Sequence, residues 1–262
     1  MALPQSKTWL VDGFCRTTRR MVSRRFTSFG VQFEQPPESL APADQSLVVF
    51  ANHIGWWDPI VAMLLRKAYF AQRTFYAPID AKALEAYGIF RQLGFYGLEL
   101  ESYSGAAAFL RTSREILSHP KSSLWITPEG RFVDCRDHEA PLMPGLAHLA
   151  ANSPDVAFVP LAIEYPFWEE AKPSIFVRFG NRIPVDGKRS KAECDRQLHQ
   201  ALRSTQQALA RDVIARRSDA FEMLIAPRRE RTSWYDTARA WSAWFHGKPF
   251  DPRHSKIGQP ER

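Results

Sequence analysis

The chain contains few cysteines, and their spacing suits neither cross-linking nor metal binding. Three occur in 262 residues, far apart and with no C-x-x-C pair. A disulfide framework and a structural zinc site are therefore not expected, and a reducing cytosol is the natural compartment. The cysteines are Cys15, Cys135 and Cys194.

Long apolar runs are also absent. No stretch approaches the roughly 18 to 20 uninterrupted apolar residues that a membrane-spanning helix requires. The N-terminus does not resemble a signal peptide, because the short apolar run after Lys7 already ends at Asp12. If the protein meets a membrane, we expect it to lie on the surface.

Several enzyme fingerprints are missing as well. The sequence has no G-x-S-x-G, no P-loop, no H-E-x-x-H and no dinucleotide-binding glycine motif. These absences remove the commonest alternative classes of α/β enzyme.

The composition is that of a folded protein with a basic surface. Hydrophobic residues make up 45% and charged residues 24%, and the formal net charge is +7. Many of the 8 Trp and 18 Phe stand beside basic residues, which is more typical of an interfacial protein than of a nucleic-acid binder. We therefore expect anionic lipid or an anionic substrate such as a coenzyme A ester, and no nucleic acid.

Residues 7–25 predict a basic amphipathic helix. Six basic residues stand against the single acidic Asp12, and apolar residues recur at helical spacing. Such a helix suits an anionic interface, but it could equally pack on the domain with its arginines in water. The basic residues are Lys7, Arg16, Arg19, Arg20, Arg24 and Arg25.

The middle of the chain alternates between strand and helix patterns, which indicates an α/β fold. We expect one domain with a mixed central sheet flanked by helices, and amphipathic helices at both ends. The expected strands are 46–51, 74–77, 95–100, 123–127, 156–164 and 174–179. The expected helices are 58–69, 81–92, 105–118, 144–151 and a long one over 191–224.

These patterns divide the chain into three expected segments. Residues 1–35 form the basic N-terminal segment, residues 36–225 the main domain after a proline-rich linker, and residues 226–262 a basic aromatic tail. In the tail, apolar residues at three- and four-residue steps form one helical face, either a second interfacial anchor or a cover for the core or a dimer contact. That face carries Trp234, Ala238, Trp241 and Phe245.

The segment Asn52–Asp58 carries the clearest chemistry. It places His53 and Asp58 five positions apart on a strand-to-helix turn, where regular structure needs neither. The carboxylate can reach one imidazole nitrogen, fix the tautomer and stabilise the imidazolium that forms when the other nitrogen takes a proton. This is a base and its orienting group without a protein nucleophile, suited to deprotonating a substrate hydroxyl.

This segment resembles the first motif, N-H-x-x-x-x-D, of the lysophosphatidate and glycerolphosphate acyltransferases (the PlsC-like family). The resemblance covers roughly residues 45–180. It implies that His53 is the catalytic base and Asp58 its partner. It also implies transfer of a fatty acyl group from acyl-CoA or acyl carrier protein to a hydroxyl of a lysophospholipid-like acceptor, with no permanently bound cofactor and no metal.

Two further blocks resemble motifs of the same family. Residues 127–132 match its P-E-G block, although Arg131 follows Gly130 directly where a Thr or Ser usually intervenes. Residues 159–163 match the V-P-V/L strand linked to the acyl donor. The resemblance implies a substrate-binding set of Asn52, Glu129, Gly130, Arg131 and Pro160. Arg131 can also pair with a phosphate on chemical grounds alone.

The remaining family motif departs from the pattern. The stretch 94–101 carries an acidic residue where the family has a basic one that meets the acceptor phosphate. Because a carboxylate repels a phosphate, this stretch leaves two alternatives: the acceptor is a glycolipid or aminolipid, or Arg91 or Arg111 replaces the missing cation.

These patterns predict a membrane-associated O-acyltransferase, held peripherally at the cytoplasmic face, with membrane lipids and the acyl donor as its partners. Two alternatives stay open. One is a non-catalytic membrane-associated protein on the same fold, and the other is a metal-dependent hydrolase with His53 and Asp58 as ligands.

Overall fold

The computed structural model describes residues 3–4, 6–42, 44–99, 102–184, 189–227 and 241. The chain divides into two compact units, residues 1–226 and residues 227–262. In the second unit only Pro227 and Trp241 are described. The expected C-terminal helix therefore lies, apart from Trp241, outside the described residues.

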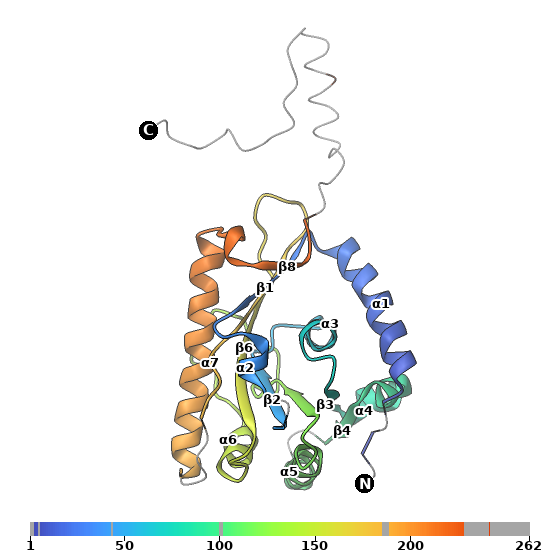
Figure 1. Cartoon of the computed structure of the whole chain (residues 1–262), viewed down its shortest axis with the longest axis vertical. Helices are drawn as coiled ribbons and strands as arrows, with labels where there is room; N and C mark the ends of the chain where they lie inside the picture. The colour runs from blue at the N-terminus through green and yellow to red at the C-terminus, as the bar shows by residue number, and fades with distance from the viewer. Residues whose placement is uncertain are drawn as a thin grey trace. The chain divides into compact units, whose positions relative to one another are not determined.

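A mixed sheet of eight strands forms the centre of the first unit (Figure 1). The strands are β1 (Phe29–Phe33), β2 (Leu47–Ala51), β3 (Thr74–Asp80), β4 (Phe95–Leu98), β5 (Ser122–Ile126), β6 (Ala157–Glu164), β7 (Ile175–Phe179) and β8 (Glu222–Ile225). Their order within the described residues is β4-β3-β5-β2-β6-β7-β1-β8. The strands from β4 to β6 run parallel, β7 is antiparallel to β6 and parallel to β1, and β8 is antiparallel to β1.

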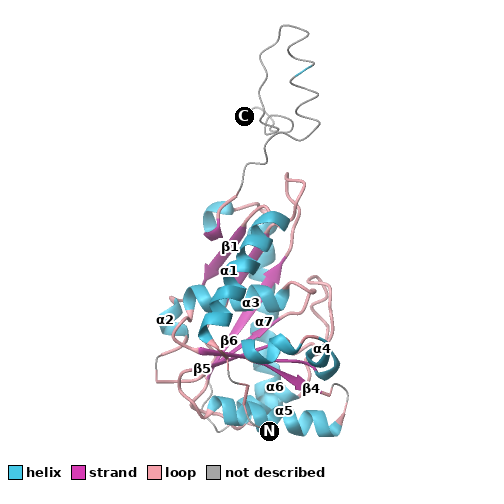
Figure 2. Cartoon of the chain, turned by 90° about the vertical axis from the view of Figure 1, so that its right-hand side faces the viewer, coloured by secondary structure: helices cyan, strands magenta, loops and turns pink. Residues whose placement is uncertain are grey.

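Helices cover both faces of this sheet. They are α1 (Thr8–Arg25), α2 (Pro37–Leu40), α3 (Asp58–Tyr69), α4 (Ala81–Ala86), α5 (Tyr103–Leu117), α6 (Gly145–Ala151) and α7 (Lys191–Ile214), with 3₁₀ turns η1 (Gly88–Leu93) and η2 (Ser218–Ala220). Figure 2 shows α1, α3 and α4 in front of the sheet. The sequence prediction of an α/β fold with a mixed sheet is confirmed.

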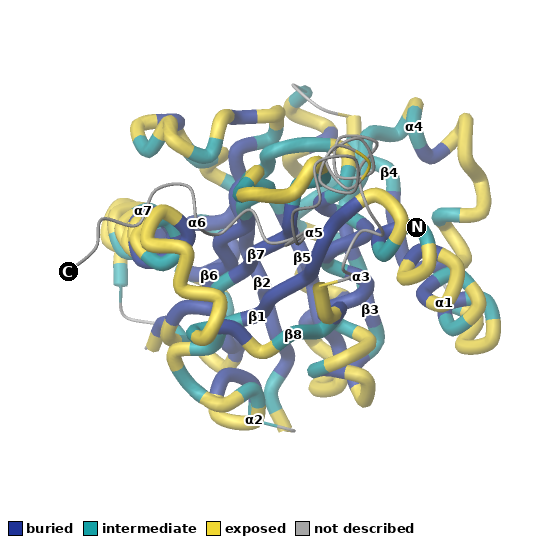
Figure 3. The backbone as a smooth tube through the Cα atoms, turned by 90° about the horizontal axis from the view of Figure 1, so that it is seen from above, coloured by how far each residue is buried: buried dark blue, intermediate teal, exposed yellow. Residues whose placement is uncertain are grey.

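Strand β2 shows why both faces carry helices. All five of its residues are buried, and successive side chains point to opposite faces. Val48 and Phe50 join a hydrophobic cluster with residues of α5, α6 and α7, whereas Leu47 and Val49 join one with residues of α1 and α3. The strands accordingly lie buried at the centre, while the outer helix surfaces are exposed (Figure 3).

The N-terminal part of the chain joins the sheet. Strand β1 was not predicted, and it lies between β7 and β8. The sheet therefore extends before residue 36, where we expected the main domain to begin, and the proline-rich linker contains α2. Helix α1 buries Val11, Cys15 and Val22 and contacts α3, so it packs on the domain.

The last long helix is shorter than predicted. It begins with a capping box formed by Ser190 and Glu193, but it ends at Ile214 instead of near residue 224. Arg216 adopts a left-handed conformation with φ of 52°, which turns the chain. Phe221 then packs on Phe176, with ring centroids 4.5 Å apart, and the next residues form β8.

Most of the other expected elements are confirmed. Helix α3 has the predicted bounds, whereas the expected helix 81–92 divides into α4 and η1. Strand β4 ends at Leu98, and residues 100–101 of the expected strand lie outside the described residues. None of the described helices combines the length and the apolar character needed to cross a bilayer.

Candidate active site

The turn between β2 and α3 brings His53 and Asp58 together, as predicted. His53 Nδ1 lies 2.7 Å from Asp58 Oδ2. The same oxygen accepts hydrogen bonds from the backbone N–H groups of Ile54, at 2.8 Å, and Gly55, at 3.0 Å. Asp58 is the first residue of α3 and its side chain is 2% exposed, so its carboxylate turns back into the loop.

The imidazole of His53 keeps one nitrogen available. Its Nδ1 faces a carboxylate, which can only accept, so Nδ1 carries the proton and Nε2 is an acceptor. Among the described residues Nε2 has no hydrogen-bond partner. The side chain is 20% exposed, and the ring of Phe132 packs beside it with centroids 4.6 Å apart. The arrangement can accept a proton from a ligand at the surface of this turn.

The Glu129 side chain is buried behind the turn and is 1% exposed. One carboxylate oxygen accepts the backbone N–H of His53 at 2.7 Å, and the other accepts Nη1 of Arg203 in α7 at 2.8 Å. In this structure Glu129 therefore holds the backbone of His53, and its role in substrate binding stays a prediction.

Gly130 and the following residues wrap the loop around the His53 turn. Gly130 has φ of +66°, a left-handed conformation that favours glycine, and a Cβ atom there would also push aside the exposed side chain of Met143, whose Sδ would lie 2.4 Å away. The backbone N–H of Val133 donates to the carbonyl of His53 at 2.7 Å. Arg131 is exposed and has no hydrogen bond or ion pair with any described residue. Of the block, Arg131 is the side chain available to an anionic ligand.

Asn52 and Pro160 are buried where β6 pairs with β2. The amide of Asn52 bonds both the N–H and the carbonyl of Ile163, at 2.9 and 3.1 Å. Pro160 lies within β6, opposite Phe50 of β2. Both residues fix β6 against the end of β2, from which the His53 turn starts, and their predicted role in substrate binding stays a prediction.

Tyr165 was missed by the sequence analysis. It directly follows β6, and its hydroxyl donates to Asp58 Oδ1 at 2.6 Å. Burial and the neighbouring Asp58 carboxylate raise the pKa of Tyr165 well above its ordinary value. The adjacent Glu164 also lies close to the site, and burial raises its pKa to about 7. No motif signal marks either residue, because their proximity to His53 depends on the pairing of β6 with β2.

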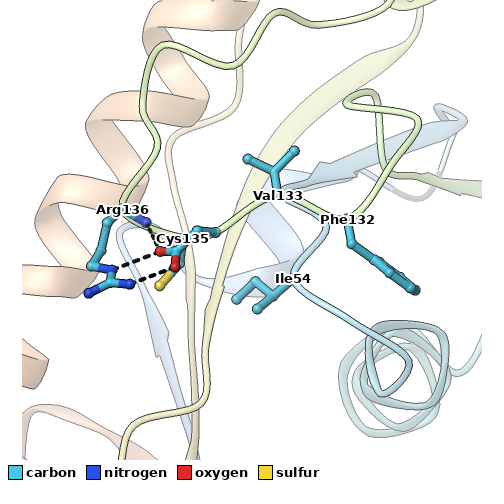
Figure 4. A pocket seen from close by; sticks show the side chains of 6 residues that line it. Ile54, Phe132, Val133, Cys135 and Arg136 are labelled. Carbon is cyan, nitrogen blue, oxygen red and sulfur yellow. Dashed lines mark hydrogen bonds and ion pairs between the residues drawn. The ribbon is translucent and has the colours of Figure 1, made fainter.

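A cavity of about 410 Å³ adjoins the turn (Figure 4). The guanidinium of Arg136 forms two hydrogen bonds to the carboxylate of Asp134, at 2.8 and 2.7 Å, so its charge is already balanced. Burial raises the pKa of the Cys135 thiol. The cavity is lined by Ile54, Phe132, Val133, Asp134, Cys135 and Arg136.

The stretch 94–101, which departs from the family motif, has an acidic side chain directly after β4. Glu99 accepts a hydrogen bond from the hydroxyl of Ser104 at 3.1 Å, while Leu100 and Glu101 lie outside the described residues. The two proposed substitutes, Arg91 in η1 and Arg111 in α5, are both exposed. Across the described ranges, no group of three or more His, Cys, Asp or Glu could hold a metal ion.

Comparisons with known proteins identify the family and the fold. The sequence profile of the family described as Acyltransferase matches residues 33–164, about half of the chain, including His53 and Asp58. The fold is similar to the crystal structure of the 1-acyl-sn-glycerophosphate (LPA) acyltransferase PlsC from Thermotoga maritima. The TM-score is 0.52 and the identity 14%, with 77% of this chain and 79% of that chain covered. No curated protein matches the sequence significantly. The chain belongs to the acyltransferase family, and it is an acyltransferase.

Proposed function

We propose that this enzyme transfers a fatty acyl group from a thioester to a hydroxyl of a lipid acceptor, with His53 as the general base. The observation that carries the proposal is the 2.7 Å contact between His53 Nδ1 and Asp58 Oδ2, which leaves Nε2 as an acceptor at the surface. Asp58 orients the ring and stabilises the imidazolium that forms.

The proton and the acyl group follow a simple sequence in this proposal. Nε2 takes the proton of the acceptor hydroxyl while that oxygen bonds to the thioester carbonyl carbon. The carbon–sulfur bond then breaks, and the imidazolium returns its proton to the departing thiolate. The products are an ester and a free thiol. No protein nucleophile and no permanently bound cofactor take part.

The acceptor that we favour is lysophospholipid-like. The structurally similar enzyme is named as a 1-acyl-sn-glycerophosphate acyltransferase. In this chain, Arg131 is exposed and unpaired among the described residues, and a guanidinium can bind a phosphate through two parallel hydrogen bonds. Arg131 would therefore hold the acceptor phosphate near His53.

A second candidate acceptor carries no phosphate. The observation that favours it is Glu99, which stands at the end of β4 where the family motif leads to a cation. A glycolipid or aminolipid would offer hydroxyl or ammonium groups that a carboxylate can bind. Arg131→Ala separates the two acceptors: it raises KM strongly for a phosphate-bearing acceptor and only slightly for an uncharged glycolipid.

We also propose that the enzyme works while bound peripherally to the cytoplasmic face of a membrane, with acyl-CoA or acyl carrier protein as donor. Arg16, Arg20 and Arg24 are exposed along α1 at four-residue steps. Each basic residue near an anionic surface contributes about 1 kcal/mol of attraction. Trp9 and Trp56 are 70% and 65% exposed, which suits insertion among lipid headgroups.

The test is identification of the product. The purified chain is incubated with labelled long-chain acyl-CoA or acyl carrier protein and a total lipid extract, and labelled lipids are identified by mass spectrometry. We expect one acyl ester class and an equivalent release of free thiol. Activity that is lost on chelation would favour a metal-dependent hydrolase, and absence of thiol release with every donor would refute the proposal and favour a non-catalytic role.

A further inference from the structure

Tyr165 occupies a fixed place beside the proposed catalytic pair. It follows the last residue of β6, whose position relative to the turn is set two residues earlier, where Asn52 bonds both backbone groups of Ile163. The Tyr165 ring packs near Phe26, with centroids 5.7 Å apart. The strand pairing and the ring contact thus bring the hydroxyl of Tyr165 to the carboxylate of Asp58.

The two oxygens of Asp58 are held in different ways. Oδ2 accepts from His53 Nδ1 and from the backbone N–H groups of Ile54 and Gly55. Oδ1 has one partner among the described residues, the hydroxyl of Tyr165 at 2.6 Å. With its backbone in α3, the orientation of the carboxylate depends on two side-chain torsions. The donors on Oδ2 restrain these torsions from one side of the carboxylate, and the bond from Tyr165 restrains the rotation about Cβ–Cγ from the other side.

We propose that Tyr165 is a positioning residue for acyl transfer: by holding Oδ1, it sets the plane of the Asp58 carboxylate and hence the direction in which His53 presents Nε2. This inference rests on the proposed role of His53 as base. Tyr165 acts through Asp58, since its hydroxyl faces the carboxylate and not the exposed side of the imidazole.

The charges around the pair fit this assignment. The raised pKa of Tyr165 keeps its hydroxyl protonated, and therefore a donor, at any pH at which the enzyme would work. Glu129, which bonds the backbone of His53, is balanced by Arg203 from α7. Glu164 is the neighbour of Tyr165 in the chain. Among the described residues, the side chains that donate hydrogen bonds to the Asp58 carboxylate are those of His53 and Tyr165.

The test compares two matched substitutions. Tyr165→Phe removes the hydroxyl and keeps the ring. Tyr69→Phe removes the same kind of bond far from the turn, because Tyr69 donates to Glu222 at 3.1 Å between α3 and β8. We expect Tyr165→Phe to lower kcat about tenfold or more with KM for donor and acceptor unchanged, as loss of one hydrogen bond to a charged group would. Tyr69→Phe should leave kcat near that of the wild type.

A second readout does not depend on turnover. The ring nitrogens of His53 are observed by ¹⁵N NMR, and their signals among the 7 histidines are assigned from their absence in His53→Ala. We expect one tautomer with the proton on Nδ1 in the wild type and a mixture of the two tautomers in Tyr165→Phe, because the Asp58 carboxylate is held less firmly without the hydroxyl. Tyr69→Phe should keep the wild-type signals.

The outcomes are distinguishable. Wild-type ring ¹⁵N signals in Tyr165→Phe overturn the positioning role, even if the fold and the activity persist. Equal losses of kcat in Tyr165→Phe and Tyr69→Phe, with no difference in the ring signals, also overturn it and indicate a purely structural bond. Failure of the proposed function appears separately, as full thiol release by His53→Ala.

Discussion

At the scale of single residues, Asp58 both shapes the turn and faces the imidazole. Its Oδ2 closes the loop through two backbone N–H groups and also contacts His53 Nδ1 at 2.7 Å. A carboxylate can do this because all three partners are donors. An amide in its place could still accept these hydrogen bonds through its oxygen, but it carries no negative charge to stabilise an imidazolium.

The substitution Asp58→Asn is therefore expected to lower kcat/KM on the order of 1,000-fold or more, because it removes the charge that stabilises the imidazolium. The matched control is Asp12→Asn, which alters an exposed ion pair with Lys67. Steady-state thiol release measures both variants. A loss smaller than tenfold in Asp58→Asn would contradict the orienting role.

The sequence predicts contacts between residues of one turn, but it does not predict contacts between segments that are far apart in the chain. His53 and Asp58 are five positions apart on one turn, so their contact follows from the motif. Glu129 was expected to bind substrate, but its ion pair with Arg203 joins residues 74 positions apart. The direction of a side chain across a folded sheet is set by packing, which a linear motif does not encode.

At the scale of elements, helix α7 supports the turn that carries His53 through a buried ion pair. Its Arg203 is 7% exposed and bonds Glu129, the side chain of Gln206 and the carbonyl of Ala140. Glu129 in turn holds the backbone of His53. A buried charge that loses its partner destabilises a protein strongly.

We expect Arg203→Met to lower the free energy of unfolding by about 3–5 kcal/mol, because it leaves the Glu129 carboxylate buried without a counter-ion. Adding Glu129→Gln should recover part of the loss. Urea denaturation measures both. Arg136→Met, which breaks an exposed pair with Asp134, is the control and should unfold close to the wild type. A single-variant loss below about 1 kcal/mol would show that the pair is not effectively buried.

Elements with strong local signals were predictable and those without were not. Helix α3 was found with its bounds because Asp58 and Pro59 mark its first turn and an apolar run fills its length. Strands β1 and β8 have five and four residues and depend on pairing with each other and with β7. Residues 215–221 continue the polar pattern of α7, so the end of that helix had no clear marker in the sequence.

At the scale of the whole molecule, Glu164 should make stability depend on pH. Burial raises its pKa to about 7 from an ordinary value of 4.5. Below pH 4.5 the carboxyl is protonated in both states and contributes nothing. Between pH 4.5 and 7 the unfolded chain ionises first, so stability falls as the pH rises, and the full cost is present above pH 7.

Glu164→Gln should therefore stabilise the fold at pH 8, by on the order of 1 kcal/mol after allowing for partial exposure, and leave it unchanged at pH 4. Thermal or urea unfolding at the two pH values measures the difference. If the variant and the wild type are equally stable at pH 8, the Glu164 carboxyl is not desolvated in the folded state.

The charge distribution predicts membrane binding through α1. Arg20→Glu with Arg24→Glu should weaken binding to vesicles containing anionic lipid by at least tenfold, and high salt should have a similar effect. Arg196→Glu with Arg211→Glu makes the same change in net charge on α7, across the sheet from α1 (Figure 1). Sedimentation with vesicles compares them. If both pairs of substitutions weaken vesicle binding equally, the net charge of the protein determines binding, and α1 is not a docking face.

The most direct test of the account is the rate of thiol release by His53→Ala, measured with acyl thioester and acceptor lipid beside the wild type, with folding checked by circular dichroism. We predict that the folded variant releases thiol at less than about one thousandth of the wild-type rate, because it lacks the imidazole that would take the proton while Asp58 stays buried with a 2% exposed side chain. Wild-type release by the folded variant would contradict the central claim that His53 takes the proton of the acceptor hydroxyl.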